Sequence, residues 1–171
     1  MSSCIYYIIV VLTYDGRMMF MESKKRVNIV KLRTIDLVKE GVINYLPRKI
    51  SSPNDCYNLV VKHIDGSDRE MFVVIALDTK NQPTAIQTVS IGSLNSTIVH
   101  PREVFKMAIL SNAAGIIVAH NHPSGEPSPS QEDNSITRRL KEAGDIIGIK
   151  LLDHIIIGSN NYYSFKETND I

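Results

Sequence analysis

The sequence has 171 residues, of which 43% are hydrophobic and 22% charged, and this is the length and composition of a single globular domain. The 19 Lys and Arg against 18 Asp and Glu give a net charge of +1, so the whole chain lacks the strong positive charge of proteins that coat nucleic acid. Positive charge is nevertheless concentrated early, because residues 17–49 hold nine Lys or Arg and three Asp or Glu. A surface that binds a polyanion is therefore expected in the first third of the chain.

Two cysteines, Cys4 and Cys56, are too few for a disulfide framework or a thiolate zinc site, and this favours a reducing, cytoplasmic location. The apolar run over residues 5–12 is far shorter than the roughly 20 residues of a transmembrane helix, and no charged residue precedes it as in a signal peptide. We therefore expect no membrane partner. Residues 1–20 are interpreted as an N-terminal extension outside the core, because the segment from Met21 is typical of a cytosolic N-terminus.

Hydrophobic periodicity predicts strands and helices from residue 21 onward. Residues 21–50 are interpreted as a basic strand and loop segment, and residues 51–171 as the main domain. Helix starts are indicated at Ser52, Pro101 and Ser130. The predicted strands span residues 27–35, 70–77, 85–91, 115–119, 154–157 and 162–165, and the predicted helices span residues 52–64, 101–114 and 130–144.

The arrangement of these elements predicts the fold class. The strands over residues 70–77 and 85–91 are joined by a turn and form a hairpin, and the fully apolar strand over residues 115–119 is of the kind buried on both faces. Residues 121–130 contain three prolines and a glycine, so they form a loop. Because strands and helices mix without strict repetition, we expect an α/β fold with a mixed sheet and helices on both sides.

Two histidines stand where the buried strand meets the proline-rich loop. Residues i and i+2 of a strand point to the same side, so His120 and His122 direct their imidazoles to one point if the extended conformation continues through them. Asp133 follows His122 by eleven residues, in the first turn of the third helix, and the loop between them can fold back to place its carboxylate alongside. Three such ligands with an open fourth position are typical of a catalytic zinc site.

A second interpretation of these residues needs no metal. His120 and His122 would then be surface loop residues, and Asp133 would cap the third helix together with Ser130, whose spacing from it matches a capping box in part. The proline-locked loop and the downstream acid favour the metal site, and both interpretations make predictions that a structure can test.

The segment HNHPSGEPSPSQED, from His120 to Asp133, resembles the JAMM signature HxHP(x)nSxxD of the MPN+ (JAB) metallopeptidases, and specifically that of their RadC-like bacterial branch. Similarity to RadC-like chains runs over residues 52–167. It is carried by four further segments: LDTKNQ (77–82), IVHPREVF (98–105), ITRRLKEAG (136–144) and LLDHIIIG (151–158). The resemblance implies a JAB/MPN, deaminase-like three-layer sandwich.

The resemblance also implies roles for single residues. His120, His122 and Asp133 would be the ligands of Zn²⁺, and Ser130 would lie close to the developing oxyanion. The family uses an upstream Glu as general acid and base, and here the candidates are Glu70, which we favour, and Glu103 in the first turn of the second predicted helix. The implied activity is a zinc-dependent hydrolase that cleaves a peptide or isopeptide bond.

An alternative function is that of a nucleic-acid-associated accessory protein, in which the basic stretch over residues 24–49 contacts phosphates. The RadC name comes from an association with DNA repair, but longer RadC-like proteins carry an N-terminal helix-hairpin-helix segment for which this chain has no room. A zinc deaminase is disfavoured because its HxE and PCxxC signature is absent. His154 is interpreted as a hydrogen-bonded core residue, and His63 and His100 as structural residues.

Overall fold

The computed structural model describes residues 9–12, 18–21, 41, 43, 48–64, 67–92 and 99–171. The chain divides into two compact units, residues 1–34 and residues 35–171. In the first unit, β1 (Ile9–Leu12) pairs antiparallel with β2 (Met18–Met21). The strand predicted over residues 27–35 and most of the basic stretch lie outside the described residues, so those interpretations stay predictions, as do the boundaries of the N-terminal extension.

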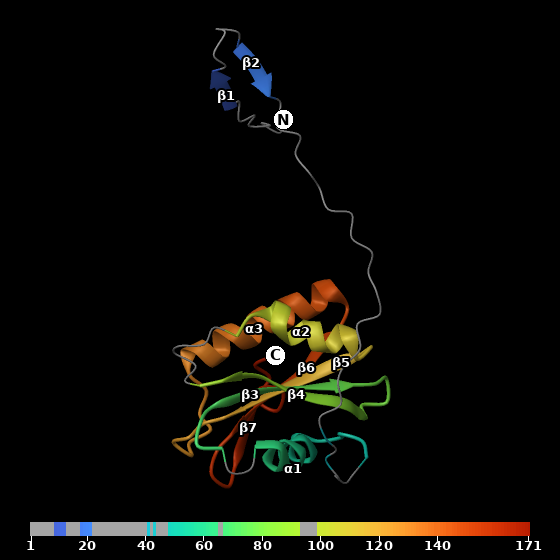
Figure 1. The fold of residues 1–171 in the computed structure, drawn as a ribbon. Helices are drawn as coiled ribbons and strands as arrows, with labels where there is room; N and C mark the ends of the chain where they lie inside the picture. Colours follow the sequence, from blue (N-terminus) through green and yellow to red (C-terminus); the bar gives the residue numbers. More distant parts are fainter. Residues whose placement is uncertain are drawn as a thin grey trace. The chain divides into compact units, whose positions relative to one another are not determined.

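The second unit contains a five-stranded mixed sheet with the order β4-β3-β5-β6-β7 (Figure 1). Only β5 and β6 pair in parallel, and the remaining neighbours are antiparallel. The predicted hairpin is the β3–β4 pair. The elements of this unit are α1 (Pro53–Ile64), β3 (Met71–Leu77), β4 (Pro83–Ile91), α2 (Pro101–Leu110), β5 (Gly115–Asn121), α3 (Gln131–Ile147), β6 (Lys150–Ile157) and β7 (Tyr162–Ser164).

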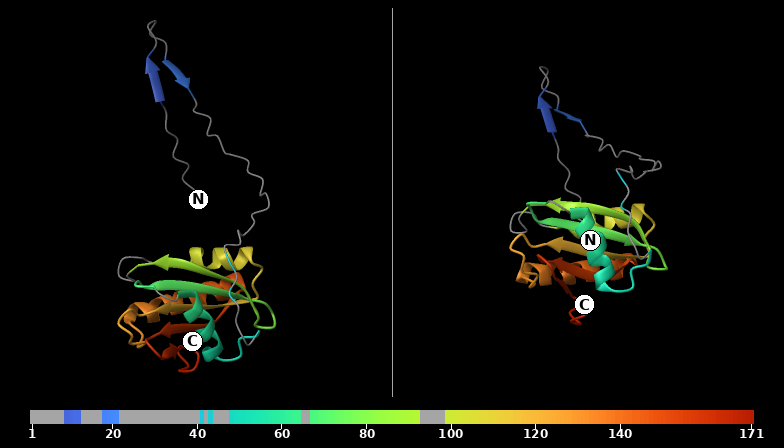
Figure 2. Two further views of the ribbon diagram at one scale, coloured as in Figure 1. Left: turned by 60° about the horizontal axis from the view of Figure 1, so that its bottom comes forward. Right: turned by 90° about the horizontal axis from the view of Figure 1, so that it is seen from below.

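The sheet is covered on both faces, which confirms the predicted α/β class. Helix α1 lies across one face, and α2 and α3 lie together on the other (Figures 1 and 2). Alternate residues of β3 enter the two cores: Val73 and Ile75 join the cluster under α1, whereas Phe72 and Val74 join the cluster under α2 and α3. The central strands are therefore apolar on both faces. Packing on both faces fixes the position of these strands, and with it the position of the side chains at their ends.

Two predicted boundaries of the sheet move in the structure. Strand β5 continues past residue 119 through His120, which pairs with Phe72 of β3 and Ile156 of β6. Strand β6 starts at Lys150 and not at residue 154. The sequence pattern missed this early part because Asp153 interrupts the apolar run, yet its buried carboxylate accepts a hydrogen bond from Ser164 Oγ at 2.7 Å.

Two predicted helix ends also move. Helix α2 ends at Leu110 rather than residue 114. The prediction that Gly144 stops the third helix is wrong: α3 runs on to Ile147, and Gly148, with φ 82°, is the left-handed C-cap. A Cβ on Gly144 would lie 2.6 Å from the carbonyl oxygen of Ile149, so this glycine permits a close approach of the following chain. Within the described part of the chain, no helix combines the length and the apolar character needed to cross a membrane.

Candidate metal centre

The two histidines of the motif meet at the C-terminal end of β5. His120 is the penultimate residue of the strand and is fully buried, whereas His122 follows the strand and keeps 17% of its side chain exposed. Their Nε2 atoms lie 3.0 Å apart. The i, i+2 alternation of an extended chain thus brings both imidazoles to one point, as the sequence predicts.

Main-chain contacts orient His122. Its N–H donates to the carbonyl oxygen of Ile157 at 2.9 Å, which extends the sheet by one bond. Its Nδ1 lies 2.7 Å from the carbonyl oxygen of Glu126 in the proline-rich loop. Because a carbonyl oxygen can only accept, Nδ1 carries the hydrogen, and in neutral His122 the lone pair therefore lies on Nε2. That nitrogen faces His120.

Asp133 reaches the same point from the first turn of α3. Its Oδ1 lies 3.1 Å from His120 Nε2, and its Oδ2 lies 3.6 Å from His122 Nε2. The capping box with Ser130 is complete: Oδ2 accepts from the Ser130 N–H at 2.7 Å and from its Oγ at 2.6 Å, and Ser130 Oγ accepts from the Asp133 N–H at 3.1 Å. The carboxylate is thus both a helix cap and a neighbour of the histidines, so the two interpretations of Asp133 are compatible.

The two oxygens of Asp133 differ in how they are satisfied. Oδ2 is held by Ser130, whereas the buried Oδ1 has no hydrogen-bond donor among the described residues, although His120 Nε2 approaches it. Burial acts to raise the pKa of Asp133, but the adjacent His120 and the hydrogen bonds from Ser130 outweigh it and hold this pKa well below its ordinary value. Asp133 is therefore an anion with one oxygen directed at the imidazoles.

The geometry of these three side chains fits a metal. Ligand atoms about 2.0 to 2.2 Å from a tetrahedral zinc ion are about 3.4 Å from one another. The Nε2 atoms of His120 and His122 lie 3.0 Å apart, and they lie 3.1 Å from Asp133 Oδ1 and 3.6 Å from Asp133 Oδ2, respectively. Each separation is within a few tenths of an ångström of that value, and the carboxylate meets the two imidazoles through different oxygens. The chemistry of the donor set, two imidazole nitrogens and a carboxylate oxygen, also suits zinc.

Glu70 is the second carboxylate at this site. It directly precedes β3, its Oε1 lies 4.0 Å from His120 Nε2, and 13% of its side chain is exposed. Glu70, His120 and His122 each offer a ligand atom within 4.8 Å of the others, so this group could bind a metal ion. The histidines are common to both possible ligand sets, and the two sets differ in whether Glu70 or Asp133 completes them.

The side chain of Asn121 fixes the position of Glu70. Its Oδ1 accepts from the N–H of Met71 at 2.8 Å, and its Nδ2 donates to the carbonyl oxygen of Arg69 at 3.0 Å. These two bonds hold the main chain on either side of Glu70 against the end of β5. Sequence reasoning did not single out Asn121, although a polar residue between the two histidines of an apolar strand is a signal that could have done so.

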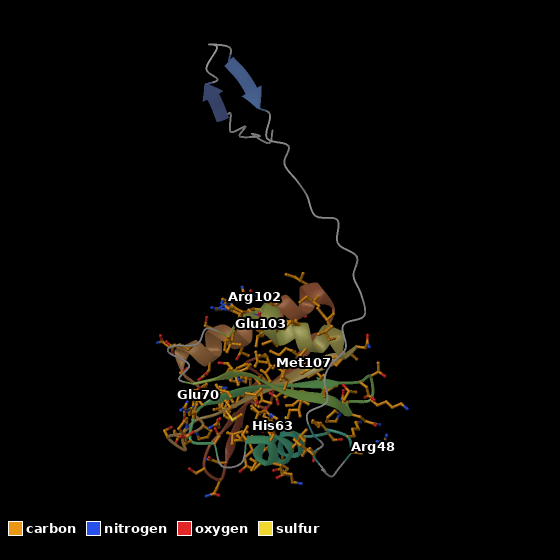
Figure 3. The ribbon with its side chains drawn as sticks, viewed as in Figure 1. Arg48, His63, Glu70, Arg102, Glu103 and Met107 are labelled. Atoms are coloured by element: carbon orange, nitrogen blue, oxygen red, sulfur yellow. The ribbon has the colours of Figure 1, made fainter. Side chains whose placement is uncertain are left out.

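Glu103, the rival candidate for the acid and base, lies on α2 in a different setting. Its carboxylate pairs with Lys106 at 2.5 Å and with Arg102 at 3.6 Å, and 43% of its side chain is exposed. Glu70 lies at the start of β3, whereas Glu103 and Arg102 project from α2 (Figure 3). The structure thus brings Glu70 to the histidines, and the catalytic role of either acid stays a prediction.

The structure places the remaining described histidines outside the group of candidate ligands, and His154 is the hydrogen-bonded core residue that the sequence predicts. His154 of β6 is fully buried behind His120, and its Nε2 lies 2.9 Å from His120 Nδ1. Burial lowers the pKa of His154 well below its ordinary value. His63 on α1 bonds to Thr88 at 3.0 Å, and burial lowers its pKa. His100 occupies the N-cap position of α2 without a side-chain cap bond.

Comparison with known proteins places this site in a family. The RadC-like JAB domain matches residues 50–170. The chain is 53% identical over 120 residues to a UPF0758 protein of Methanosarcina mazei, and this covers 70% of the chain and 52% of that protein. It is 54% identical over 118 residues to a UPF0758 protein of Desulfitobacterium hafniense (69% and 52% covered) and 56% identical over 123 residues to one of Clostridium botulinum (72% and 54% covered).

The chain spans about half the length of these curated relatives. Residues 50–170, over which the RadC-like JAB domain matches, contain the whole five-stranded sheet, its three helices and the group formed by Glu70, His120 and His122. The fold and the sequence match agree, and the chain belongs to the RadC-like JAB domain family.

Proposed function

We propose that the RadC-like domain is a zinc-dependent hydrolase that cleaves a peptide or isopeptide bond, with His120, His122 and Asp133 as the metal ligands. The observation that carries the proposal is the convergence of two imidazole Nε2 atoms, 3.0 Å apart, with the buried carboxylate of Asp133. Its Oδ1 lies 3.1 Å from His120 Nε2, and its Oδ2 lies 3.6 Å from His122 Nε2. Three ligand atoms directed at one point leave one position of a tetrahedral site open for chemistry.

Asp133 is the better third ligand, and Glu70 the better acid and base. Asp133 is fully buried and lies 0.9 Å closer to His120 Nε2 than Glu70 does, at 3.1 Å against 4.0 Å. Glu70 is partly exposed, so it can meet both water and a substrate. Asp133, whose carboxylate is held by Ser130, thus binds the metal, and the more accessible Glu70 transfers protons.

Each residue then has a defined task. Bound zinc would supply a Lewis acid that polarises a carbonyl and acidifies water. Glu70 accepts the proton of the water that adds to the carbonyl carbon, and it returns that proton to the amine nitrogen as the carbon–nitrogen bond breaks. Ser130 holds Asp133 Oδ2 at 2.6 Å, and on rotation its hydroxyl would donate to the developing oxyanion.

Elemental analysis tests the metal site directly. The purified chain, prepared without chelator and offered zinc, should retain about one zinc ion, and His120→Ala and His122→Ala should abolish binding because two protein ligands are too few. The matched controls are His63→Ala and His100→Ala, which lie outside the site and should keep the ion. A wild-type protein that retains no zinc would refute the proposal.

Activity is tested separately with the zinc-loaded protein. A library of internally quenched peptides and a lysine-linked isopeptide probe cover the two bond types, and His122→Ala serves as the inactive control. Cleavage of either probe by the wild type alone supports the proposal. Zinc binding without cleavage of any probe would contradict the hydrolase while leaving the metal site intact.

A further inference from the structure

A chain of hydrogen bonds runs behind the candidate ligands, from α3 through β6 to β5. Thr137 Oγ1 lies 2.6 Å from the carbonyl oxygen of Asp133 and 2.6 Å from His154 Nδ1. His154 Nε2 lies 2.9 Å from His120 Nδ1. His120 Nε2 in turn lies 3.1 Å from Asp133 Oδ1, so these contacts start and end on the same residue and form a ring of four side chains and one carbonyl group. The step between His120 and Asp133 is a close approach and not a hydrogen bond.

The carbonyl oxygen of Asp133 determines where the hydrogens of Thr137, His154 and His120 lie. The carbonyl oxygen of Asp133 can only accept, so the single hydroxyl hydrogen of Thr137 points to it. Thr137 Oγ1 must then accept from His154, which places a hydrogen on His154 Nδ1. His154 is fully buried, where a neutral imidazole is favoured, so its Nε2 carries the lone pair and accepts from His120 Nδ1. His120 is thereby left with its own lone pair on Nε2.

We propose that Thr137 and His154 are positioning residues that fix the tautomer and the ring orientation of His120, so that its Nε2 lone pair faces Asp133 and His122. The effect of this tautomer on metal binding rests on the proposed function, since a ligand nitrogen must be free of hydrogen to bind a metal. His122 is fixed in the same tautomer by the Glu126 carbonyl, so both imidazoles present the same nitrogen.

Ring contacts hold His154 in place within this relay. The imidazole stacks on Phe165, with centroids 5.0 Å apart and planes at 8°, and meets Phe72 edge-on at 5.7 Å. The His120 ring stacks on the same Phe72, with centroids 5.9 Å apart and planes at 12°. Apolar rings around the two imidazoles exclude water, so no solvent donor or acceptor competes with Thr137 for His154.

The first test removes the hydroxyl group at the start of the relay. Thr137→Val keeps the shape of the side chain but not its hydrogen bonds, and it should raise the zinc dissociation constant about 10- to 100-fold, which is typical of partners behind a metal ligand. Thr137→Ser restores the hydroxyl and should restore affinity. The affinities are measured by competition with a chromophoric chelator, and the visible absorption of the cobalt-substituted protein reports ligand geometry.

The chain offers a matched control on the opposite face of the sheet. Thr88 Oγ1 bonds to His63 Nε2 at 3.0 Å, which is the same pair of groups without a link to His120. Thr88→Val should leave both the zinc affinity and the cobalt spectrum unchanged. Wild-type affinity and spectrum in Thr137→Val would overturn the inference, whereas failure of the wild type itself to bind either metal would refute the proposed function.

A second measurement needs no variant and therefore no assumption about folding. NMR of isotopically labelled imidazole nitrogens in the metal-free wild type should show the hydrogen on Nδ1 of both His120 and His154. A hydrogen on Nε2 of His154 would reverse the direction of the relay and overturn the inference. The tautomers decide this point even if the protein binds no metal.

Discussion

Glu70 and Glu103 are acids of the same type in contrasting surroundings. Glu70→Gln should keep zinc but lower turnover about 10²- to 10⁴-fold, because the amide preserves shape while it removes the proton acceptor. Zinc content by elemental analysis and turnover on the peptide library are measured together. Glu103→Gln, which removes only the exposed pairs with Lys106 and Arg102, is the matched control and should be fully active. The assignment is wrong if the two variants exchange these outcomes.

Asp133 serves two tasks in one carboxyl group, and Asp133→Asn separates them. Asparagine keeps a side-chain oxygen that can accept from the N–H and hydroxyl groups of Ser130, but it is a poor zinc ligand because it carries no charge. We therefore expect loss of zinc with at most about 1 kcal/mol of lost stability in the metal-free protein. Zinc titration and thermal unfolding without metal measure the two effects. Full zinc occupancy would remove Asp133 from the ligand set and leave Glu70 as the third ligand.

Ser130→Ala completes this comparison because its hydroxyl group contacts Asp133 and not the histidines. The loss of the cap should lower the free energy of unfolding by about 1 kcal/mol. If the hydroxyl also serves the oxyanion, turnover falls by about 10² or more at unchanged zinc content, and this is the result that we expect. Unchanged turnover would limit Ser130 to capping.

The residues of the candidate site differ in how far the sequence could reveal them. The convergence of His120 and His122 follows from strand alternation, a rule that acts over a few residues. For Asp133 the local pattern indicates only the cap with Ser130, and its place beside the histidines is expected from the loop that can fold back and from the resemblance to the JAMM signature. His154 contacts His120 across 34 positions of sequence, through the parallel pairing of β5 with β6. Strand order and register decide that contact, and neither can be read from a local pattern.

Gly144, inside α3, allows the following chain to approach the helix closely because glycine has no Cβ. A Cβ there would meet the Ile149 carbonyl oxygen at 2.6 Å and Phe105 Cζ at 3.2 Å. Gly144→Ala should therefore destabilise the fold by about 1 to 3 kcal/mol, although alanine is the better helix former. Gly148→Asn is the control, since asparagine tolerates the left-handed C-cap and nothing lies within 4 Å of a Cβ there. Equal Tm values for Gly144→Ala and the wild type would contradict this account.

The elements themselves were largely predictable, and their ends were not. Apolar periodicity identified every helix and strand from residue 53 onward, because each buries one stripe or both faces against a neighbour. The errors arise where a residue has a role that its local pattern does not show. Gly144 looks like a helix stop, but the helix continues to Ile147 and ends before Gly148, where the chain turns left-handed. Asp153 concealed the start of β6 because two of the groups that satisfy its buried carboxylate, Ser164 Oγ and the Lys166 N–H, come from β7 and the residues after it.

At the scale of the molecule, residues 1–34 and residues 35–171 form separate compact units. Deleting residues 1–20 should therefore leave the thermal unfolding of the domain unchanged within error. Unfolding of the full chain and the shortened chain is compared at equal concentration. A loss of more than about 2 kcal/mol would mean that residues 5–12 contribute a buried apolar element.

The unequal exposure of the site has a kinetic consequence. His120 and Asp133 have no exposed side-chain surface, and only Glu70 and His122 meet solvent, at 13% and 17%. An ion held there would leave at a rate limited by transient local opening of the surrounding chain. The rate of zinc loss should thus reach a plateau as the concentration of EDTA rises in a stopped-flow experiment. If the rate of zinc loss instead stayed proportional to the EDTA concentration, EDTA would reach the ion directly. The bound ion would then be as accessible to bulky reagents as an ion on the protein surface.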